Sequence, residues 1–291
     1  MQRICRSGTK FRALEFSLLA IAALFLLSPV PNSAARQAPQ PEKPESAKPT
    51  PRTPDGHPDF NGFWRAAQLN PGNLSRNSAD GSVAFEFKRP KTCDDDSCQD
   101  PNQPSYKPQY LGEVKVIAKA QAYGTNPLDP QFECKPLGIP RGAAGAMQIV
   151  QSSGVIAILY EGSPGPIYRM IYMNGRAHPR NLQPSFLGDS VGHWEGNALV
   201  VDVTGLNAET WLGGGLPGTQ KYTSIHSDQE HVVEHWTRGG NIITYEATVD
   251  DPVMLTKPWV INPRHVQLVD AKEDQIQEIP CVPDSKVKSG K

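Results

Sequence analysis

The stretch that decides the fold is residues 167–211, IYRMIYMNGRAHPRNLQPSFLGDSVGHWEGNALVVDVTGLNAETW. Apolar and polar residues alternate in two runs within it, 190–195 and 198–204, and Gly196-Asn197 stands between these runs. Alternation with a period of two is typical of strands that bury one face, and a short Gly-containing link between such runs favours a tight turn. The stretch therefore predicts a β-hairpin in a protein built largely from antiparallel strands.

Similar runs on both sides extend this pattern. They are 147–152, 155–160 and 167–173 before the hairpin, and 230–238, 241–250, 259–261 and 265–269 after it. Asn174-Gly175 favours a type I′ turn, although Pro179 and Pro184 limit any strand that follows. We predict an all-β fold, in which an antiparallel meander forms a lipocalin-like barrel or a sandwich behind an irregular, loop-rich N-terminal half.

The chain is expected to divide into four parts. Residues 1–35 combine basic residues with a short apolar run and small residues, the pattern of a signal peptide; an uncleaved membrane anchor is the alternative. Residues 36–52 are rich in Pro and charge and predict a disordered linker. Residues 53–282 are expected to form a single β-rich domain, and 283–291 a disordered tail. We therefore predict a periplasmic or secreted protein.

Cysteine usage agrees with export. Loss of a signal peptide would remove Cys5 and leave four cysteines, and an even number in an exported chain favours disulfides. Four cysteines allow three pairings. We favour Cys93–Cys98, which closes an acidic loop, and Cys134–Cys281, which ties the start of the β region to its end. A zinc site is the alternative, but the chain lacks the CxxC spacing that would support it.

Charge and motif content argue against several kinds of partner. Lys and Arg number 29 and Asp and Glu 30, so the formal net charge is −1, and no basic stripe is present. We therefore predict no nucleic-acid partner and, once the signal is removed, no membrane partner. No GxGxxG loop stands between a strand and a helix, and we predict no cofactor. The oligomeric state stays open.

Several ordered segments carry a resemblance to a known family. They are PDGHPD at 54–59 with GFW at 62–64, DP at 129–130, CKP at 134–136 with GIPR at 138–141, RMIYMNGRAHP at 169–179, GDSVGHWEGNALVVD at 188–202, and DP at 251–252 with TKPW at 256–259. In this respect the chain resembles a family of uncharacterised exported bacterial proteins. The family pattern has Asp at two turns where this chain has Asn174 and Asn197. The resemblance implies export and a β fold, and it brings no known reaction.

Four residues form a candidate catalytic set: Arg169, Asp189, His193 and Glu195. His193 and Glu195 share a strand face, and a His beside a carboxylate can act as an acid–base pair or hold a metal. The alternative is a solvated hairpin rim. Arg169 in a central strand needs a partner, for which Asp202 or Glu234 would serve.

A second set comprises candidate ligand-binding residues: Tyr168, Tyr172, Trp194 and Glu234. Tyr168, Met170 and Tyr172 share one strand face, and if that face points into a barrel it would line a pocket. Ordinary core packing is the alternative for these tyrosines and for Trp194. An Arg169–Glu234 pair could anchor a ligand carboxylate, although a structural pair is the simpler interpretation.

The segment His231-Val-Val-Glu-His235 matches the HxxEH pattern of zinc proteases. That motif works on a helix, where both histidines reach one metal. Here the flanking valines and the following Gly-Gly predict a strand, on which residues four apart are separated by roughly 13 Å. We therefore predict no metal site, and we expect the loop residue His178 to be solvated.

Three functions remain open at this level. The first is an exported β-barrel that binds a small apolar or aromatic molecule. The second is a periplasmic hydrolase, lyase or isomerase with an Arg/Asp/His/Glu site, and the third is a structural envelope protein. A barrel interior filled with side chains and without a cavity would contradict the first function with its ligand inside the barrel, and a dispersed catalytic set would argue against the enzyme. A broad exposed apolar patch would favour the third function.

Overall fold

The computed structural model describes residues 49–66, 102–120, 127–161, 167–213, 225–269, 276–277 and 280–283. Its strands are β1 (Gly62–Ala66), β2 (Met147–Gln151), β3 (Val155–Tyr160), β4 (Ile167–Tyr172), β5 (Asp189–Glu195), β6 (Ala198–Thr204), β7 (His231–Gly239), β8 (Ile242–Asp250), β9 (Trp259–Val260) and β10 (Arg264–Val269). Helix α1 (Leu111–Lys119) and the 3₁₀ turns η2 (Pro108–Tyr110) and η3 (Pro130–Glu133) complete the described elements. No helix in these ranges is both long enough and apolar enough to cross a membrane. The predicted signal peptide and the predicted Cys93–Cys98 bridge lie outside the described residues.

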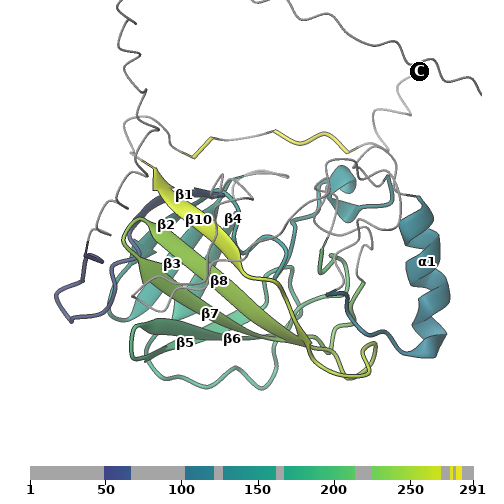
Figure 1. The fold of residues 1–291 in the computed structure, drawn as a ribbon. Coiled ribbons are helices and arrows are strands. Elements are labelled where there is room, and N and C mark those ends of the chain that lie inside the picture. Colours follow the sequence, from purple (N-terminus) through teal and green to yellow (C-terminus); the bar gives the residue numbers. More distant parts are fainter. Residues whose placement is uncertain are drawn as a thin grey trace, which may run out of the picture. The chain divides into compact units, whose positions relative to one another are not determined.

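The strands close into a barrel (Figure 1). Neighbouring strands follow the order β10-β1-β2-β3-β4-β5-β6-β7-β8, and β10 also pairs with β8. The closing ladders include Trp64↔Leu268 between β1 and β10 and Val266↔Ile243 between β10 and β8. The short strand β9 adds to the other end of β8. The predicted all-β barrel is thus confirmed. Each of these nine strands pairs with a neighbour on both sides, so backbone groups stay open only where a ladder is shorter than its strands.

One ladder departs from the predicted meander. Strands β4 and β5 run parallel and pair only through Ile171↔Ser190 and Tyr172↔Val191. The predicted type I′ turn at Asn174-Gly175 is wrong, because Gly175 has a positive φ of 71° but Asn174 does not. The chain instead returns through the irregular segment 173–188 before β5 begins. The barrel is therefore mixed, with a single parallel step.

Strand β1 lies in the part of the chain that the sequence predicted to be irregular. It contributes Trp64, which is fully buried and donates from Nε1 to the carbonyl of Phe60 at 2.9 Å. A run of five residues that begins at Gly62 is too short for periodicity to identify. This short strand is stabilised by its hydrogen-bonded pairing with β2 and β10, and the pairing completes the barrel.

The PDGHPD motif covers the turn between β5 and β6. The ring of His57 stacks on Trp194 with centroids 4.5 Å apart and planes 4° apart. Phe60 contacts the same indole at a centroid distance of 5.8 Å. Arg52 donates from Nη1 to Oδ1 of Asn197 at 3.1 Å. These contacts join the N-terminal motif to the hairpin on which the fold prediction rested.

The barrel interior is a packed core. The inward-facing side chains include Trp64, Met147, Ile149, Ile156, Ile158, Ile171, Val201, Val203, Val232, Trp236, Ile243, Tyr245, Val249 and Val266, and each is at most 2% exposed. Side chains that expose so little surface leave no room beside them for a water molecule, let alone a ligand. Any small-molecule site in the described residues must therefore lie outside the barrel axis.

The predicted Cys134–Cys281 disulfide is present. It joins the residue that follows η3 to the C-terminal segment, across a sequence separation of 147. A covalent link across so long a loop removes many conformations from the unfolded chain and thereby stabilises the folded state.

Replacing both cysteines with serine is expected to lower the free energy of unfolding by roughly 2–5 kcal/mol. Urea unfolding of the wild-type protein and the Cys134→Ser/Cys281→Ser variant would measure this difference. Unfolding of the wild type under reducing conditions is the control, because it should reproduce most of the loss. Equal stability of all three samples would show that the bond contributes nothing to folding.

Candidate functional site

A groove with a volume of about 440 Å³ opens on the outer wall of the barrel beside β4. Its walls are β4 itself, the segment 185–189 and Pro136. Small-molecule sites commonly measure about 300–1,000 Å³, so the groove is large enough for an aromatic molecule of modest size. We call this feature the β4 groove.

The groove forms because the segment 185–188 diverges from the first half of β4. The segment 185–188 is bound to the end of β6, since Ser185 N–H donates to Gly205 and Asn207 N–H donates to Ser185, each at 2.9 Å. Gly188 makes the turn into β5 with a φ of +60°, and a Cβ there would lie 2.4 Å from the carbonyl oxygen of Thr204. Only glycine satisfies both the backbone angle and this close approach. The segment is thus held away from the first half of β4.

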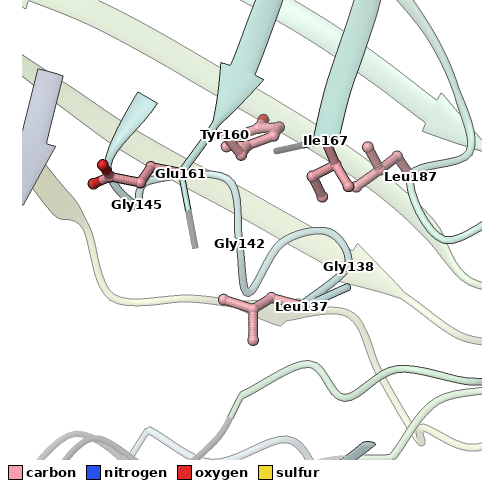
Figure 2. A pocket seen from close by; sticks show the side chains of 8 residues that line it. All are labelled: Leu137, Gly138, Gly142, Gly145, Tyr160, Glu161, Ile167 and Leu187. Carbon is pink, nitrogen blue, oxygen red and sulfur yellow. The ribbon is translucent and has the colours of Figure 1, made fainter. Parts of the chain in front are cut away.

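A smaller pocket of about 40 Å³ adjoins the groove (Figure 2). It is lined by Tyr160 at the end of β3, by Leu137, and by Ile167 and Leu187, which also line the groove. Figure 2 shows Ile167 and Leu187 side by side at the start of β4, with Leu137 across the pocket from them. This inner pocket has room for water or for one small apolar substituent of a ligand.

The tyrosines of β4 lie in the groove and not in the barrel. Tyr168 is 70% exposed, and both Tyr168 and Tyr172 line the groove. The opposite face of the strand, with Arg169 and Ile171, points into the core. The interpretation that the aromatic face lines the barrel interior is therefore wrong, because the interior is occupied by the charged partner that Arg169 requires.

That partner is Glu234 on β7, one of the two carboxylates that the sequence suggested. Arg169 donates from Nη1 and Nη2 to the two carboxylate oxygens of Glu234 at 3.1 and 2.7 Å, and both side chains are at most 1% exposed. Arg169 also donates from Nε to Ser190 at 2.8 Å, and the hydroxyl of Tyr245 donates to Glu234 at 2.9 Å. A bidentate pair with these additional bonds satisfies both buried charges.

The electrostatic environment keeps Arg169 charged. Burial alone would lower the pKa of its guanidinium, but the Glu234 carboxylate and the nearby Tyr160 raise it, and the net pKa lies above the ordinary value. All polar atoms of the pair are directed at protein partners. Because both side chains are at most 1% exposed, the pair supports the core and is not accessible to a ligand carboxylate.

The candidate catalytic set does not assemble. His193 and Glu195 form a hydrogen bond of 3.1 Å, but their side chains are 59% and 62% exposed on the hairpin. Asp189 lies on the same strand, four residues from His193, a separation of roughly 13 Å along the strand. Arg169 lies on the inner side of the barrel wall. Trp194 is covered by His57 and does not line the groove.

Asp189 belongs instead to an outer polar chain that the sequence did not reveal. Arg176 donates to both of its carboxylate oxygens, and His178 Nδ1 lies 2.6 Å from Oδ2. His178 Nε2 lies 2.9 Å from Asp202 on β6, and His231 on β7 lies 3.0 Å from the other oxygen of Asp202. His178, expected to be a solvated loop residue, therefore links the 173–188 segment to two strands.

The outer polar chain fixes one end of the groove. The guanidinium of Arg176 lies over the ring of Tyr172, 4.0 Å from its centroid, so this aromatic wall is held in place. Partial burial raises the pKa of Asp189, but its bonds to Arg176 and His178 outweigh this effect and lower the pKa. Asp189 is therefore a carboxylate at neutral pH. Both nitrogens of His178 face carboxylates, those of Asp189 and Asp202.

A further polar cluster is buried away from the groove. His226 Nδ1 lies 2.7 Å from Glu230, and His226 Nε2 lies 2.9 Å from the hydroxyl of Thr210. This order of hydroxyl, imidazole and carboxylate is also found in nucleophilic enzymes. All three residues are at most 3% exposed, and neither the groove nor the inner pocket is lined by them. The sequence gave no periodic signal for this cluster.

No group of three or more His, Cys, Asp or Glu side chains in the described part of the chain is arranged to hold a metal ion. The HxxEH segment lies on β7, as its flanks predicted, and its two histidines are thus at strand spacing.

No family model, curated protein or solved structure matches the chain.

The buried pair can be tested by removing one or both charges. Arg169→Met leaves Glu234 buried without its cation and is expected to cost about 3–5 kcal/mol of unfolding free energy. Arg169→Met/Glu234→Gln removes both charges and keeps an acceptor for Tyr245, so most of that loss should be recovered. Urea unfolding measures both values. A single variant as stable as the wild type would contradict the assigned role.

Alkaline stability provides a second test. Burial, with the Glu234 charge, raises the pKa of Tyr160 to about 12, although Arg169 opposes the shift. An unfolded tyrosine titrates near pH ~10. The folded state therefore holds the Tyr160 proton where the unfolded chain has lost it, and stability should fall as the pH rises from about 10 to 12.

Thermal unfolding from pH 8 to pH 12 should show this decline, flattened in Tyr160→Phe. The buried Tyr160 hydroxyl makes no hydrogen bond of normal geometry among the described residues, although it lies close enough to interact with Arg169, so the variant should differ little from the wild type at neutral pH. Tyr245→Phe should also flatten the decline, because burial and the Glu234 charge raise the pKa of Tyr245 as well, but it differs from Tyr160→Phe in that losing its bond to a buried carboxylate should cost roughly 1.5–3 kcal/mol at neutral pH. If stability falls with pH as steeply in Tyr160→Phe as in the wild type, ionisation of Tyr160 does not cause the decline.

Proposed function

We propose that this protein is an exported β-barrel protein that binds a small, neutral aromatic molecule in the β4 groove. The observation that carries the proposal is the groove itself, which lies outside a filled barrel and has both a suitable volume and an aromatic wall. Export is supported by the signal-like residues 1–35, by the Cys134–Cys281 bond and by the resemblance to an exported family.

The lining of the groove supports an aromatic ligand. Tyr168 exposes most of its ring to the groove, while Tyr172 is held against Arg176. Met170, Phe186 and Leu187 add apolar surface. Exposed tyrosine rings stack on or pack edge-to-face against aromatic molecules, and a flexible methionine adapts to the shape of a ligand.

The charges around the groove support a neutral ligand. Arg169 is paired with Glu234, and Arg176 is paired with Asp189. No charged residue of the groove wall therefore lacks an opposite charge within the protein. A charged ligand would have to break one of these pairs, whereas a neutral ring would leave them intact.

The other two functions have less support. The residues of the predicted catalytic set are separated by the barrel wall and by strand spacing. Of the large apolar residues that are exposed in the described ranges, Val116, Val150 and Val260 lie on three different elements, α1, β2 and β9, whereas Leu159 and Tyr168 pair directly across β3 and β4 beside the groove.

Binding of 2-naphthol, a neutral fluorescent aromatic probe, tests the proposal. We expect saturable binding, and we expect Tyr168→Ala to weaken it by about threefold to tenfold, the value of one aromatic contact. Tyr168 is largely exposed, so this substitution should leave the fold intact. Fluorescence titration of the probe gives the dissociation constants.

Val150→Ala is the matched control, because Val150 is an exposed apolar residue on β2, outside the groove. It should bind the probe as the wild type does. Absence of saturable binding, or equal weakening by both substitutions, would overturn the proposal.

A further inference from the structure

The backbone of β4 presents unpaired groups along the groove. Across β3 and β4, Met173 N–H donates to the carbonyl of Gly154 at 3.0 Å. Backbone groups of successive residues point to opposite sides of a strand. The residues that pair with β3 are therefore the odd-numbered ones, and Tyr168, Met170 and Tyr172 direct their N–H and C=O groups away from β3, toward β5 and the groove.

The ladder with β5 uses only part of this side. It begins at Ile171↔Ser190 and continues through Tyr172↔Val191. Farther toward the start of β4 the facing segment, 185–188, is bound to the end of β6. Among the described residues, no strand pairs with this side of Tyr168, so its N–H and C=O, with the N–H of Met170, form a short open edge inside the groove.

The open edge stands beside the aromatic wall. Tyr168 thus offers a ring and a donor–acceptor pair to the same ligand, and the inner pocket begins at the neighbouring Ile167. A strand edge of this kind recognises groups that carry an N–H and a C=O with the spacing of a peptide. The charged residues of the wall are paired, so nothing there favours a ligand with a net charge.

We infer that the natural ligand is a neutral aromatic amide, which adds to the edge of β4 as a short extra strand. Its C=O accepts from the backbone of β4, its N–H donates to the carbonyl of Tyr168, and its ring packs on the side chains of the groove. This inference rests on the proposed function and names the class of ligand for the same site.

Two probes with the same ring test it by calorimetry. N-acetyl-L-phenylalaninamide carries N–H donors on both of its amide groups, and N-acetyl-N-methyl-L-phenylalanine dimethylamide carries none. We expect the methylated probe to bind about tenfold more weakly, because edge hydrogen bonds are lost while the aromatic contact is retained. Equal affinity for the two probes would overturn the inference and leave the aromatic site in place.

A backbone variant gives an independent test. Met170→Pro removes an N–H that faces the groove and takes no bond from the β3–β4 ladder, a position at which a strand tolerates proline. Met170→Ala loses the same side chain and keeps the N–H, so the difference between the two variants reports on the N–H alone, and Met170→Pro should bind the amide probe severalfold more weakly than Met170→Ala does. Equal amide affinity for the two variants would contradict the edge contact. If 2-naphthol and both amides fail to bind the wild type, the proposed function falls as well.

Discussion

The buried pair between Arg169 and Glu234 is the interaction on which the rest of the barrel depends. Two charges inside a closed barrel are tolerated only if each finds its partner, so strands β4 and β7 must present these side chains to the same interior layer. This requirement fixes which face of β4 is buried. Tyr168 and Met170, on the alternate face, must then lie outside, where they form the wall of the groove.

The parallel step between β4 and β5 is the second constraint, and it produces the site. Because β5 runs parallel to β4 and pairs with its last two residues, the chain must turn back before it pairs again, and this needs a long connection. That connection is held by β6 and by the outer polar chain of Arg176, His178, Asp189 and Asp202. The ladder is consequently short. The gap beside it combines apolar surface with open backbone groups, a combination that a filled barrel interior does not offer.

Local patterns predicted much of this fold. Alternation located β2 to β8, because this signal depends on neighbours in the chain. The Gly-Asn turn located the β5–β6 hairpin, and the Gly-Gly turn located the β7–β8 hairpin to within one residue, since its turn residues are Gly240 and Asn241. The need of a central Arg for a carboxylate pointed to Glu234. Strand β1, the parallel step and the role of His178 depend on contacts between segments that are distant in the sequence. Such contacts cannot be predicted from the pattern of a few neighbouring residues. For the same reason, the sequence grouped His193 with Arg169, which the barrel wall separates.

The most direct test of a ligand site outside a filled barrel is an amide-resolved NMR titration of the wild-type protein with N-acetyl-L-phenylalaninamide. The account predicts that the largest shift changes cluster at the backbone amides of Tyr168, Met170 and Leu187. The amides of core residues such as Val201 and Val249 should change little. Changes concentrated in the barrel interior, or at the exposed His193–Glu195 hairpin, would contradict it.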